Sequence, residues 1–243
     1  MLKTLLMDMD DTLCDTQAAN RSARASFAEQ LHHHFPAIDH ERAATVYLKG
    51  IYRELSAAHA KVLLPVTHER NFRIQLIRMI LQDEGVSEVP EEIANQLQDN
   101  FDRVRFASYG FFPGIRELLL EMRSHFTLVV ITNGATFSQL PKIEASGLRN
   151  YVDFILVGGE EPEEKPAVSI FRKALSLAGC EASEAIHFGD SLEADIQGAN
   201  NSGIRSVWIS HGKDLDTRFG VTPVHTIENP FQMRDLLYSL HEF

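Results

Sequence analysis

The stretch Leu5-Leu6-Met7-Asp8-Met9-Asp10-Asp11-Thr12-Leu13 decides how this sequence folds and where its chemistry lies. The apolar residues 2–7 predict a short strand, and carboxylates follow it directly. Open α/β sheets bind their ligands at the carboxyl ends of strands. Two carboxylates about 4 Å apart repel each other by roughly 4 kcal/mol at an effective dielectric constant near 20, so Asp8 and Asp10 need a cation or a shared proton. Mg²⁺ suits this position because it binds carboxylate oxygens together with substrate phosphates.

This acidic stretch allows a simple and a specific interpretation. Acidic residues after a strand usually form a polar turn and nothing more. A carboxylate is also able to attack phosphorus as a covalent nucleophile, and water then hydrolyses the aspartyl phosphate. The specific interpretation makes Asp8 the nucleophile of a metal-dependent phosphohydrolase.

Six short apolar runs, rich in β-branched or aromatic residues, predict strands. They are residues 2–7, 128–131, 154–157, 185–188, 206–209 and 224–227. Most lack polar alternation, which suits a sheet buried on both faces, and helical segments separate them. The expected fold class is therefore α/β, with a doubly wound, Rossmann-like parallel sheet. Helix signals agree: Pro166 is expected as a first helical residue, Ser191 as an N-cap, and Gly179 and Gly203 just past helix ends.

Residues 16–106 interrupt this pattern of alternating strands and helices. They contain long helical stretches and little that predicts strand, with apolar residues at helical spacing such as Phe72, Leu76, Met79 and Ile80. We therefore expect a helical domain at 16–106, inserted into an α/β core made of residues 1–15 and 107–243.

Charge and cysteine content restrict the partners and the compartment. The formal net charge is −11, without a Lys/Arg cluster that reverses this field, so neither nucleic acid nor a membrane surface is expected as a partner. A small anionic substrate remains possible, because a pocket with one cation and suitable amides overrides the repulsion from the net negative charge. Two distant cysteines, no secretion signal and no apolar run of roughly 20 residues indicate a cytoplasmic protein. We expect a monomer or a homodimer.

Two later segments offer groups that bind phosphate. Residues 128–134 end in Thr132, Asn133 and Gly134, whose hydroxyl and amides are able to hold an oxyanion. Lys165 precedes a predicted helix and is placed to neutralise the nucleophile and to bind the transferring phosphoryl group. Taken alone, the first segment is an ordinary strand and turn, and the lysine an ordinary surface residue.

The segment 185–191 is a further apolar strand that delivers Asp190 at its carboxyl end, as a third carboxylate for the metal ion. Asp195 follows about one helical turn later. It is suited to hydrogen-bond either metal-bound water or Lys165, and a solvated helix residue is an equally open interpretation.

In this order, the four segments resemble the motifs of the haloacid dehalogenase superfamily, specifically its phosphatases with a helical cap inserted after the first motif (subfamily I, C1 cap). The resemblance covers nearly the whole chain. It extends to Phe112-Pro113-Gly114, to Lys142-Ile143-Glu144 and to residues 189–199. It implies the α/β core already expected, with residues 16–106 as a smaller, all-helical cap domain.

The resemblance also implies roles for the site residues. The residue that matches Asp8 is the nucleophile, and the one that matches Asp10 protonates the leaving group and then activates water. Neighbouring carboxylates are expected to raise the pKa of Asp10, which suits a proton donor. The implied Mg²⁺ ligands are the side chain of Asp8, the backbone carbonyl of Asp10 and Asp190, with Asp195 behind them, and the implied phosphate-binding residues are Thr132, Asn133 and Lys165.

The resemblance says less about the substrate than about the roles of the site residues. Asp10 separates the phosphatases from the dehalogenases, which carry another residue there and need no metal. Residues 190–203 are most similar to relatives that act on nucleoside monophosphates (nucleotidases) or sugar phosphates, and a phosphoglycolate-type phosphatase is the alternative. After Lys165 and Pro166 this chain has Ala167-Val168 where many relatives have Asp-Pro.

A non-hydrolytic phosphoacceptor protein is a different class that also combines acidic residues with a Thr and a Lys at strand ends. Such receiver modules have no ninety-residue helical insert, and their accepting aspartate lies on a middle strand, where this sequence offers none.

The inserted segment holds candidates for substrate contacts. Thr16, Gln17, Asn20 and Arg21 follow the acidic turn, and three further arginines are candidates for an anionic group. These are Arg53, Arg70 and Arg73, each of which is more simply interpreted as a solvated helix residue.

Overall fold

The computed structural model describes residues 1–216, 218 and 220–240. The chain divides into two compact units. One contains residues 1–16 and the described chain from Tyr109 onward, and the other contains residues 17–108. We call them the sheet unit and the helical unit and describe each by itself. Within the described residues, none of the helices is both long and apolar enough to cross a membrane.

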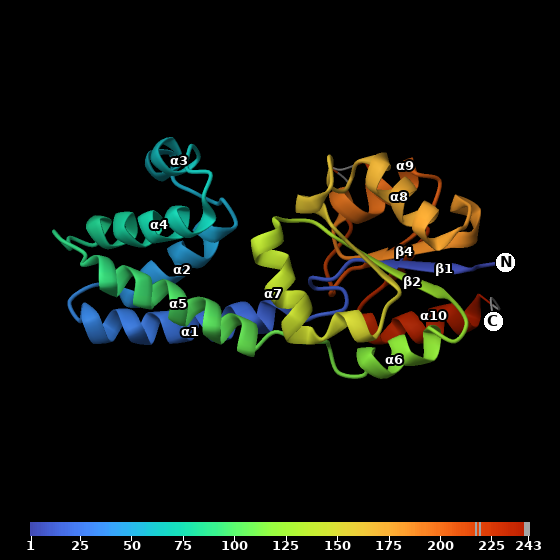
Figure 1. Ribbon diagram of the computed structural model, residues 1–243, viewed down its shortest axis with the longest axis horizontal. Helices are drawn as coiled ribbons and strands as arrows, with labels where there is room; N and C mark the ends of the chain where they lie inside the picture. Colours follow the sequence, from blue (N-terminus) through green and yellow to red (C-terminus); the bar gives the residue numbers. More distant parts are fainter. Residues whose placement is uncertain (217, 219, 241–243) are drawn as a thin grey trace. The chain divides into compact units, whose positions relative to one another are not determined.

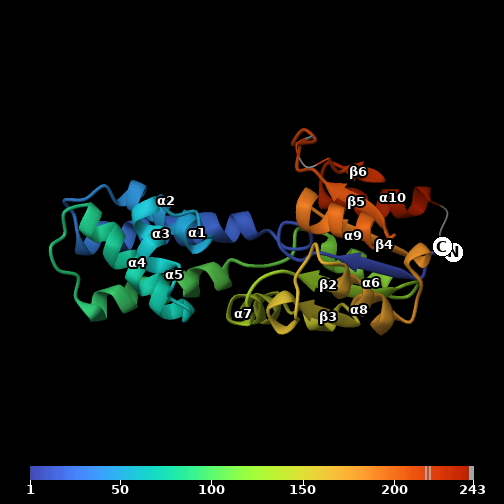
Figure 2. The ribbon, with the colours of Figure 1, turned by 90° about the horizontal axis from the view of Figure 1, so that it is seen from above.

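The sheet unit is built on six parallel strands, seen from above in Figure 2. In sheet order they are β3 (Phe154–Val157), β2 (Thr127–Thr132), β1 (Thr4–Met7), β4 (Ala185–Gly189), β5 (Arg205–Ile209) and β6 (His225–Ile227). Every residue of β1 and β4 is buried, as expected for strands covered on both faces. The predicted α/β class is confirmed. The strand order reverses between β1 and β4, and a doubly wound sheet binds its ligand at that point.

Helices cover both faces of this sheet (Figure 1), with α8 and α9 on one side and α6 and α10 on the other. Their bounds are α6 (Ile115–Met122), α7 (Thr136–Ser146), α8 (Val168–Ala178), α9 (Gly198–Asn201) and α10 (Met233–Ser239), with a π-helical turn at Leu192–Gln197 and 3₁₀ turns at Leu148–Asn150, Gly158–Glu160, Ala182–Glu184 and Pro230–Gln232. Under α8, Ile170 and Phe171 pack against Leu6, Val129 and Ile131 of the strands. Each such side chain, when fully buried, contributes roughly 1.5–3 kcal/mol.

The helix boundaries follow the sequence signals with one exception. Ser191 is an N-cap, because its hydroxyl oxygen accepts from Ala194 N at 3.1 Å. Gly179 lies just past α8 with φ of 64°. The prediction that Pro166 begins a helix was wrong, because α8 begins at Val168. Lys165 and Pro166 instead lie in a turn, in which Ala167 N donates to Glu164 O at 2.9 Å and the backbone of Lys165 bonds a side chain from another loop.

The helical unit contains five helices around a core of its own. They are α1 (Thr16–His34), α2 (His40–Ile51), α3 (Ala57–Leu63), α4 (Glu69–Asp83) and α5 (Glu91–Ala107). Phe27, Tyr47 and Phe101 form its aromatic centre, with ring centroids 4.5 to 5.9 Å apart. Such pairs stabilise by about 0.5–1.5 kcal/mol beyond the area they bury. Met79, expected in this core, is only partly buried.

Candidate active site

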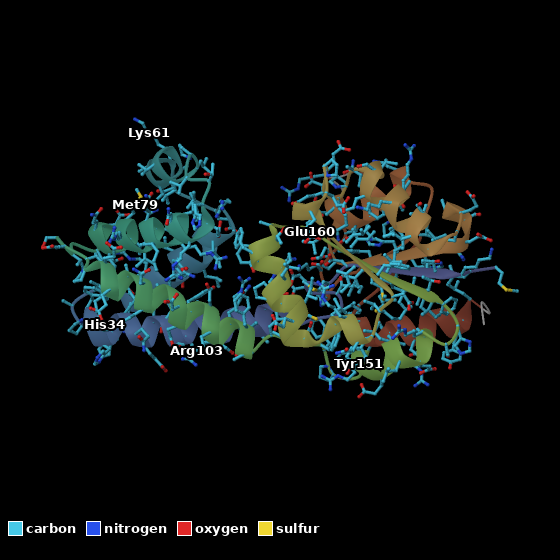
Figure 3. The ribbon with its side chains drawn as sticks, in the orientation of Figure 1. His34, Lys61, Met79, Arg103, Tyr151 and Glu160 are labelled. Carbon is cyan, nitrogen blue, oxygen red and sulfur yellow. The ribbon has the colours of Figure 1, made fainter. Side chains whose placement is uncertain are left out.

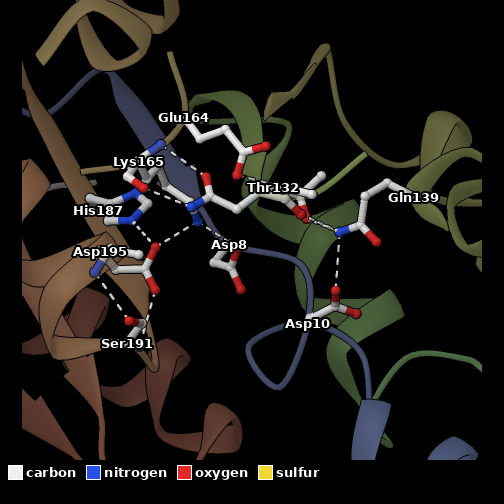
Figure 4. A network of polar contacts seen from close by, with 12 residues as sticks. Asp8, Asp10, Thr132, Gln139, Glu164, Lys165, His187, Ser191 and Asp195 are labelled. Carbon is white, nitrogen blue, oxygen red and sulfur yellow. Dashed lines mark hydrogen bonds and ion pairs between the residues drawn. The ribbon is translucent and has the colours of Figure 1, made fainter. Parts of the chain in front are cut away.

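Asp8 is fixed at the carboxyl end of β1. Its N–H donates to Phe188 O at 2.9 Å, which ties it to β4. Its Oδ1 accepts from Lys165 Nζ at 2.5 Å, and the same ammonium donates to Asp195 Oδ1 at 2.6 Å (Figure 4). The Lys165 side chain is 1% exposed, so it is a buried ion-pair partner and not a surface residue. Asp8 Oδ2 makes no hydrogen bond to any described residue.

Asp195 is the buried anchor of this group. Besides Lys165, its carboxylate accepts from Ser191 N at 3.0 Å, and His187 Nε2 lies 3.0 Å from Oδ1. A Cβ on Gly189 would lie 2.2 Å from Asp195 Cγ, so only glycine at the end of β4 allows this carboxylate to approach. Of the two partners considered from the sequence, Asp195 therefore contacts the lysine directly.

Three carboxylates lie close together, and the ammonium of Lys165 is the cation near them. Oxygens of Asp8, Asp190 and Asp195 lie within 4.8 Å of one another. Burial raises the pKa of Asp8 to about 7, although Lys165 opposes it. Burial and the charge of Asp8 raise the pKa of Asp190 to about 8. Burial also acts on Asp195, but Lys165 and His187 outweigh it and hold that pKa below its ordinary value. One lysine does not balance this negative charge, so the donor set fits a divalent oxygen-binding cation such as Mg²⁺.

Asp10 points to a different cation from the one that holds Asp8. Its Oδ1 accepts from Thr16 Oγ1 at 2.6 Å and Tyr109 Oη at 2.7 Å, and its Oδ2 from Lys142 Nζ at 2.7 Å and Gln139 Nε2 at 3.1 Å. The expectation of a raised pKa was wrong. Burial does raise the pKa of Asp10, but the charge of Lys142 and the hydrogen bonds outweigh it, so the pKa lies well below its ordinary value.

The loop after β2 contributes more to positioning than was expected. Both polar ends of the Asn133 side chain bond the backbone of Lys165, with Nδ2 donating to its O at 2.7 Å and Oδ1 accepting from its N at 2.9 Å. The N–H of Gly134 donates to a Glu164 carboxylate oxygen at 3.2 Å. Among the groups that the structure describes, the N–H of Asn133 makes no hydrogen bond. This N–H and the hydroxyl of Thr132 are the donors that this loop offers to an oxyanion.

The sequence interpretation gave no site role to Gln139, Lys142 or Tyr109, although Lys142 lies in a segment that carries the family resemblance. Gln139 Nε2 also donates to Thr132 Oγ1 at 2.6 Å, so it joins the β2 loop to Asp10. A signal for two of them existed: Gln139 and Lys142 occupy the buried face of α7 together with Ile143, where an amphipathic helix normally places apolar residues. Tyr109 gave no comparable signal, because a single tyrosine after a helix is common.

The arginines considered for substrate binding are paired within the helical unit. The ion pairs are Arg53 with Glu69 at 2.6 Å, Arg73 with Glu69 at 2.7 Å and Asp102 at 2.8 Å, and Arg70 with Asp99 at 2.5 Å. Arg53 and Arg70 are exposed, as expected for solvated helix residues, but Arg73 is buried, so that interpretation was wrong for Arg73. Of the candidates close to the acidic turn, Thr16 contacts Asp10, and Asn20 belongs to a cluster described below.

Comparison with known proteins identifies the class to which this fold and site belong. The family model for haloacid dehalogenase-like hydrolases matches residues 2–203, and the chain belongs to this family. The chain is 26% identical over 245 residues to human N-acylneuraminate-9-phosphatase, covering 98% of this chain and 95% of that one. The predicted enzyme class, a phosphatase-type hydrolase of this family, is confirmed.

Two solved structures share the fold. The HAD-hydrolase YfnB of Bacillus subtilis, bound to magnesium, superposes with a TM-score of 0.70 at 22% identity and covers 97% of this chain and 98% of its own. A 2-haloacid dehalogenase of Pseudomonas syringae superposes with a TM-score of 0.64 at 28% identity and covers 99% of this chain and 100% of its own. The fold alone therefore does not separate phosphatase from dehalogenase chemistry.

The ion pair between Lys142 and Asp10 leads to a stability prediction. The side chain of Lys142 is 4% exposed and that of Asp10 is 27% exposed, so Lys142→Met leaves a partly buried carboxylate without its cation. We expect a loss of about 1–3 kcal/mol in the free energy of unfolding at pH 7, less than for a fully buried pair because three neutral donors remain. Urea unfolding in a chelating buffer measures it.

The pH dependence provides the control for this variant. Because the folded-state pKa of Asp10 is depressed, its stabilisation is present above the unfolded-state pKa of about 4 and is lost as the pH falls through the folded-state value. The difference between wild type and Lys142→Met should therefore shrink below about pH 4. A difference that is independent of pH would show that Lys142 acts only by packing.

Proposed function

We propose that this chain is a Mg²⁺-dependent phosphomonoester hydrolase that works through an aspartyl phosphate on Asp8. The observation that carries this proposal is the state of the Asp8 carboxylate. Lys165 fixes one oxygen, and the other has no hydrogen-bond partner among the described residues. A buried carboxylate held by one oxygen is suited to attack phosphorus with the other.

The residues around Asp8 fit a magnesium ion. Asp8 and Asp190 would supply carboxylate oxygens and Asp10 its backbone carbonyl, while both oxygens of Asp195 are already engaged by protein donors. Asp195 therefore acts through Lys165. When bound, Mg²⁺ supplies charge that neutralises the phosphoryl oxygens and orients them for in-line displacement.

Two half-reactions follow from this arrangement. In the first, Asp8 Oδ2 forms a bond to phosphorus, the ester P–O bond breaks, and the leaving oxygen takes a proton from Asp10. In the second, water attacks phosphorus, the bond to Asp8 breaks, and Asp10 accepts the proton of the water. Because Asp10 is held ionised by Lys142 and three neutral donors, the described geometry corresponds to the base of the second half-reaction.

The phosphate would be held by groups from two loops. Lys165 Nζ, the hydroxyl of Thr132 and the N–H of Asn133 supply donors for the equatorial oxygens, whose charge must be balanced in a loose transition state. The Asn133 side chain contributes by fixing the backbone of Lys165. Asn133 therefore offers its own N–H to the phosphate and also positions Lys165, the second donor.

The substrate class is a small phosphate ester. Similarity to N-acylneuraminate-9-phosphatase over nearly the whole chain supports a sugar phosphate over a nucleoside monophosphate or phosphoglycolate. The shared fold with a 2-haloacid dehalogenase makes dehalogenation the second candidate. Asp10 and the carboxylate cluster favour the phosphatase, because displacement of a halide requires neither a proton donor for the leaving group nor a divalent cation.

Substitution of the two aspartates tests the mechanism. Asp8→Asn should lower kcat at least about 10³-fold for every phosphate ester, because the amide is no nucleophile. The fold should persist, since the raised pKa of Asp8 shows that its charge is unfavourable in the metal-free site. Asp10→Asn should lower kcat about 10²- to 10⁴-fold for alkyl esters and allow the phosphoenzyme to accumulate from 4-nitrophenyl phosphate, whose leaving group needs no proton.

Phosphate release and quench-flow trapping of ³²P-labelled protein measure these effects. Retained turnover in Asp8→Asn would exclude the covalent route. Halide release from 2-chloropropionate, without phosphate release from any ester, would establish the dehalogenase instead.

Magnesium binding should depend on pH. Asp8 and Asp190 have raised folded-state pKa values, so in the metal-free protein these two groups bind more protons than in the unfolded chain between about pH 4 and 8, and their contribution to stability falls as the pH rises through this range. Mg²⁺ displaces these protons and should bind at least about tenfold more tightly at pH 8.5 than at pH 6. A tenfold change corresponds to about 1.4 kcal/mol, or about 3–6 °C in Tm for a chain of this size.

Thermal unfolding with and without MgCl₂ at the two pH values measures this difference. Asp190→Asn serves as the matched variant and should lose most of the shift. An equal Mg²⁺-induced shift at both pH values would count against these carboxylates as the ligands.

A further inference from the structure

Arg105 differs from the other buried arginine of the helical unit in its partners. Arg73 has two carboxylates, whereas Arg105, which is 2% exposed, contacts only neutral groups among the described residues. Its Nε donates to Asn20 Oδ1 at 2.9 Å and its Nη2 to Tyr52 Oη at 2.6 Å. The carboxylate one turn earlier on α5, Asp102, is engaged by Arg73 at one oxygen and by a glutamine at the other. The guanidinium is therefore a buried cation without a counter-ion.

Hydrogen bonds within the cluster of Asn20, Tyr52 and Arg105 occupy its acceptor atoms, but some of its donor groups have no partner in the described part of the chain. Tyr52 Oη accepts from Arg105 and also from Asn20 Nδ2 at 2.9 Å, so its own hydroxyl hydrogen remains available. Arg105 Nη1 has no hydrogen-bond partner among the described residues. Tyr52 is 48% exposed, so solvent reaches the cluster from its side. Several N–H groups and one O–H are thus presented without an acceptor.

Burial of a charged group without a partner is unfavourable, and proteins normally pair such charges. The same unit pairs Arg53, Arg70 and Arg73 with carboxylates, which shows that acidic residues are available to it. An unpaired guanidinium among oriented neutral groups is the arrangement expected where the counter-ion arrives with a ligand. Its planar fork matches the two oxygens of a carboxylate.

We propose that Asn20, Tyr52 and Arg105 bind a carboxylate group carried by the substrate. Resting on the proposed function, this defines the substrate as a phosphate monoester of a carboxylic acid. One guanidinium balances a carboxylate of charge −1, whereas a second phosphate of charge near −2 would leave negative charge uncompensated. Asn20 and Arg105 lie four residues along the chain from Thr16 and Tyr109, whose hydroxyls donate to Asp10.

Two pairs of substrates isolate the carboxylate. O-Phosphoserine and O-phosphoethanolamine differ only by this group, and 6-phosphogluconate differs from glucitol 6-phosphate by a carboxylate in place of a hydroxymethyl group. In at least one pair, wild type should prefer the acid. Arg105→Gln should lower kcat/KM for that acid about 10- to 100-fold, since hydrogen bonds to charged groups are strong, and should change the other member less than about threefold. Tyr52→Phe, which removes only the hydroxyl, should lower kcat/KM for the acid about three- to tenfold.

Arg103→Gln is the matched control. Arg103 lies on the same helix and is exposed (Figure 3). Within the described residues its side chain makes one hydrogen bond, to Asn100 Oδ1 at 2.6 Å, so its loss should leave both members of each pair unchanged. An equal loss for both members in Arg105→Gln would show a structural role and overturn the inference. If Arg105→Gln does not fold, Tyr52→Phe decides by the same comparison.

The remaining outcomes separate this inference from the proposed function. Hydrolysis of 4-nitrophenyl phosphate and other esters by wild type, without preference for the acid in either pair, overturns the carboxylate site and leaves the phosphatase intact. Dependence on Arg105 only with fructose 1,6-bisphosphate, compared with fructose 6-phosphate, would assign a second phosphate instead of a carboxylate. No hydrolysis of any ester with Mg²⁺ would overturn both.

Discussion

The buried ammonium of Lys165 is the interaction on which the candidate active site depends. Its side chain is held by Asp8 after β1 and by Asp195 after β4, and its backbone by Asn133 after β2. Three loops that are far apart in sequence are thus fixed to one residue. Moving these ions out of water costs several kcal/mol each, so the packed sheet must supply the stability that this arrangement lacks. The parallel sheet brings the three loops together because its strands end at the same edge.

The sheet unit and the helical unit each contain a charge that the described residues do not balance. In the sheet unit, three carboxylates share one lysine, and burial together with the charges of the neighbouring carboxylates raises the pKa values of Asp8 and Asp190. In the helical unit, the guanidinium of Arg105 has only neutral partners. Elsewhere in the same units, buried charges are paired, as Lys142 is with Asp10 and Arg73 is with Asp102. The unbalanced groups are therefore exceptions within a chain that normally neutralises buried charge.

The sequence predicted the features that depend on periodicity and strand ends. The six strands, the helical insert and the placement of acidic residues after β1 and β4 follow from apolar runs and their punctuation. The environment of Asp10 was not predictable in this way. Its pKa depends on Lys142, 132 residues away in the sequence, and on which way its carboxylate turns after the strand ends. Similarly, the acidic turn does not reveal that the Asn133 side chain positions Lys165, because that contact joins two loops.

The contrast between Asp8 and Asp10 explains how two aspartates in one turn are suited to different chemistry. Burial with two other carboxylates makes ionisation of Asp8 costly until a cation arrives, which links its nucleophilic form to metal binding. Asp10 faces the opposite environment, where Lys142, Gln139 and two hydroxyls stabilise the ionised form. To act as an acid, Asp10 must first gain a proton and weaken its bond to Lys142. The proton that it accepts from water in one turnover is the proton that it donates in the next, so the ionised form seen here is one half of that cycle.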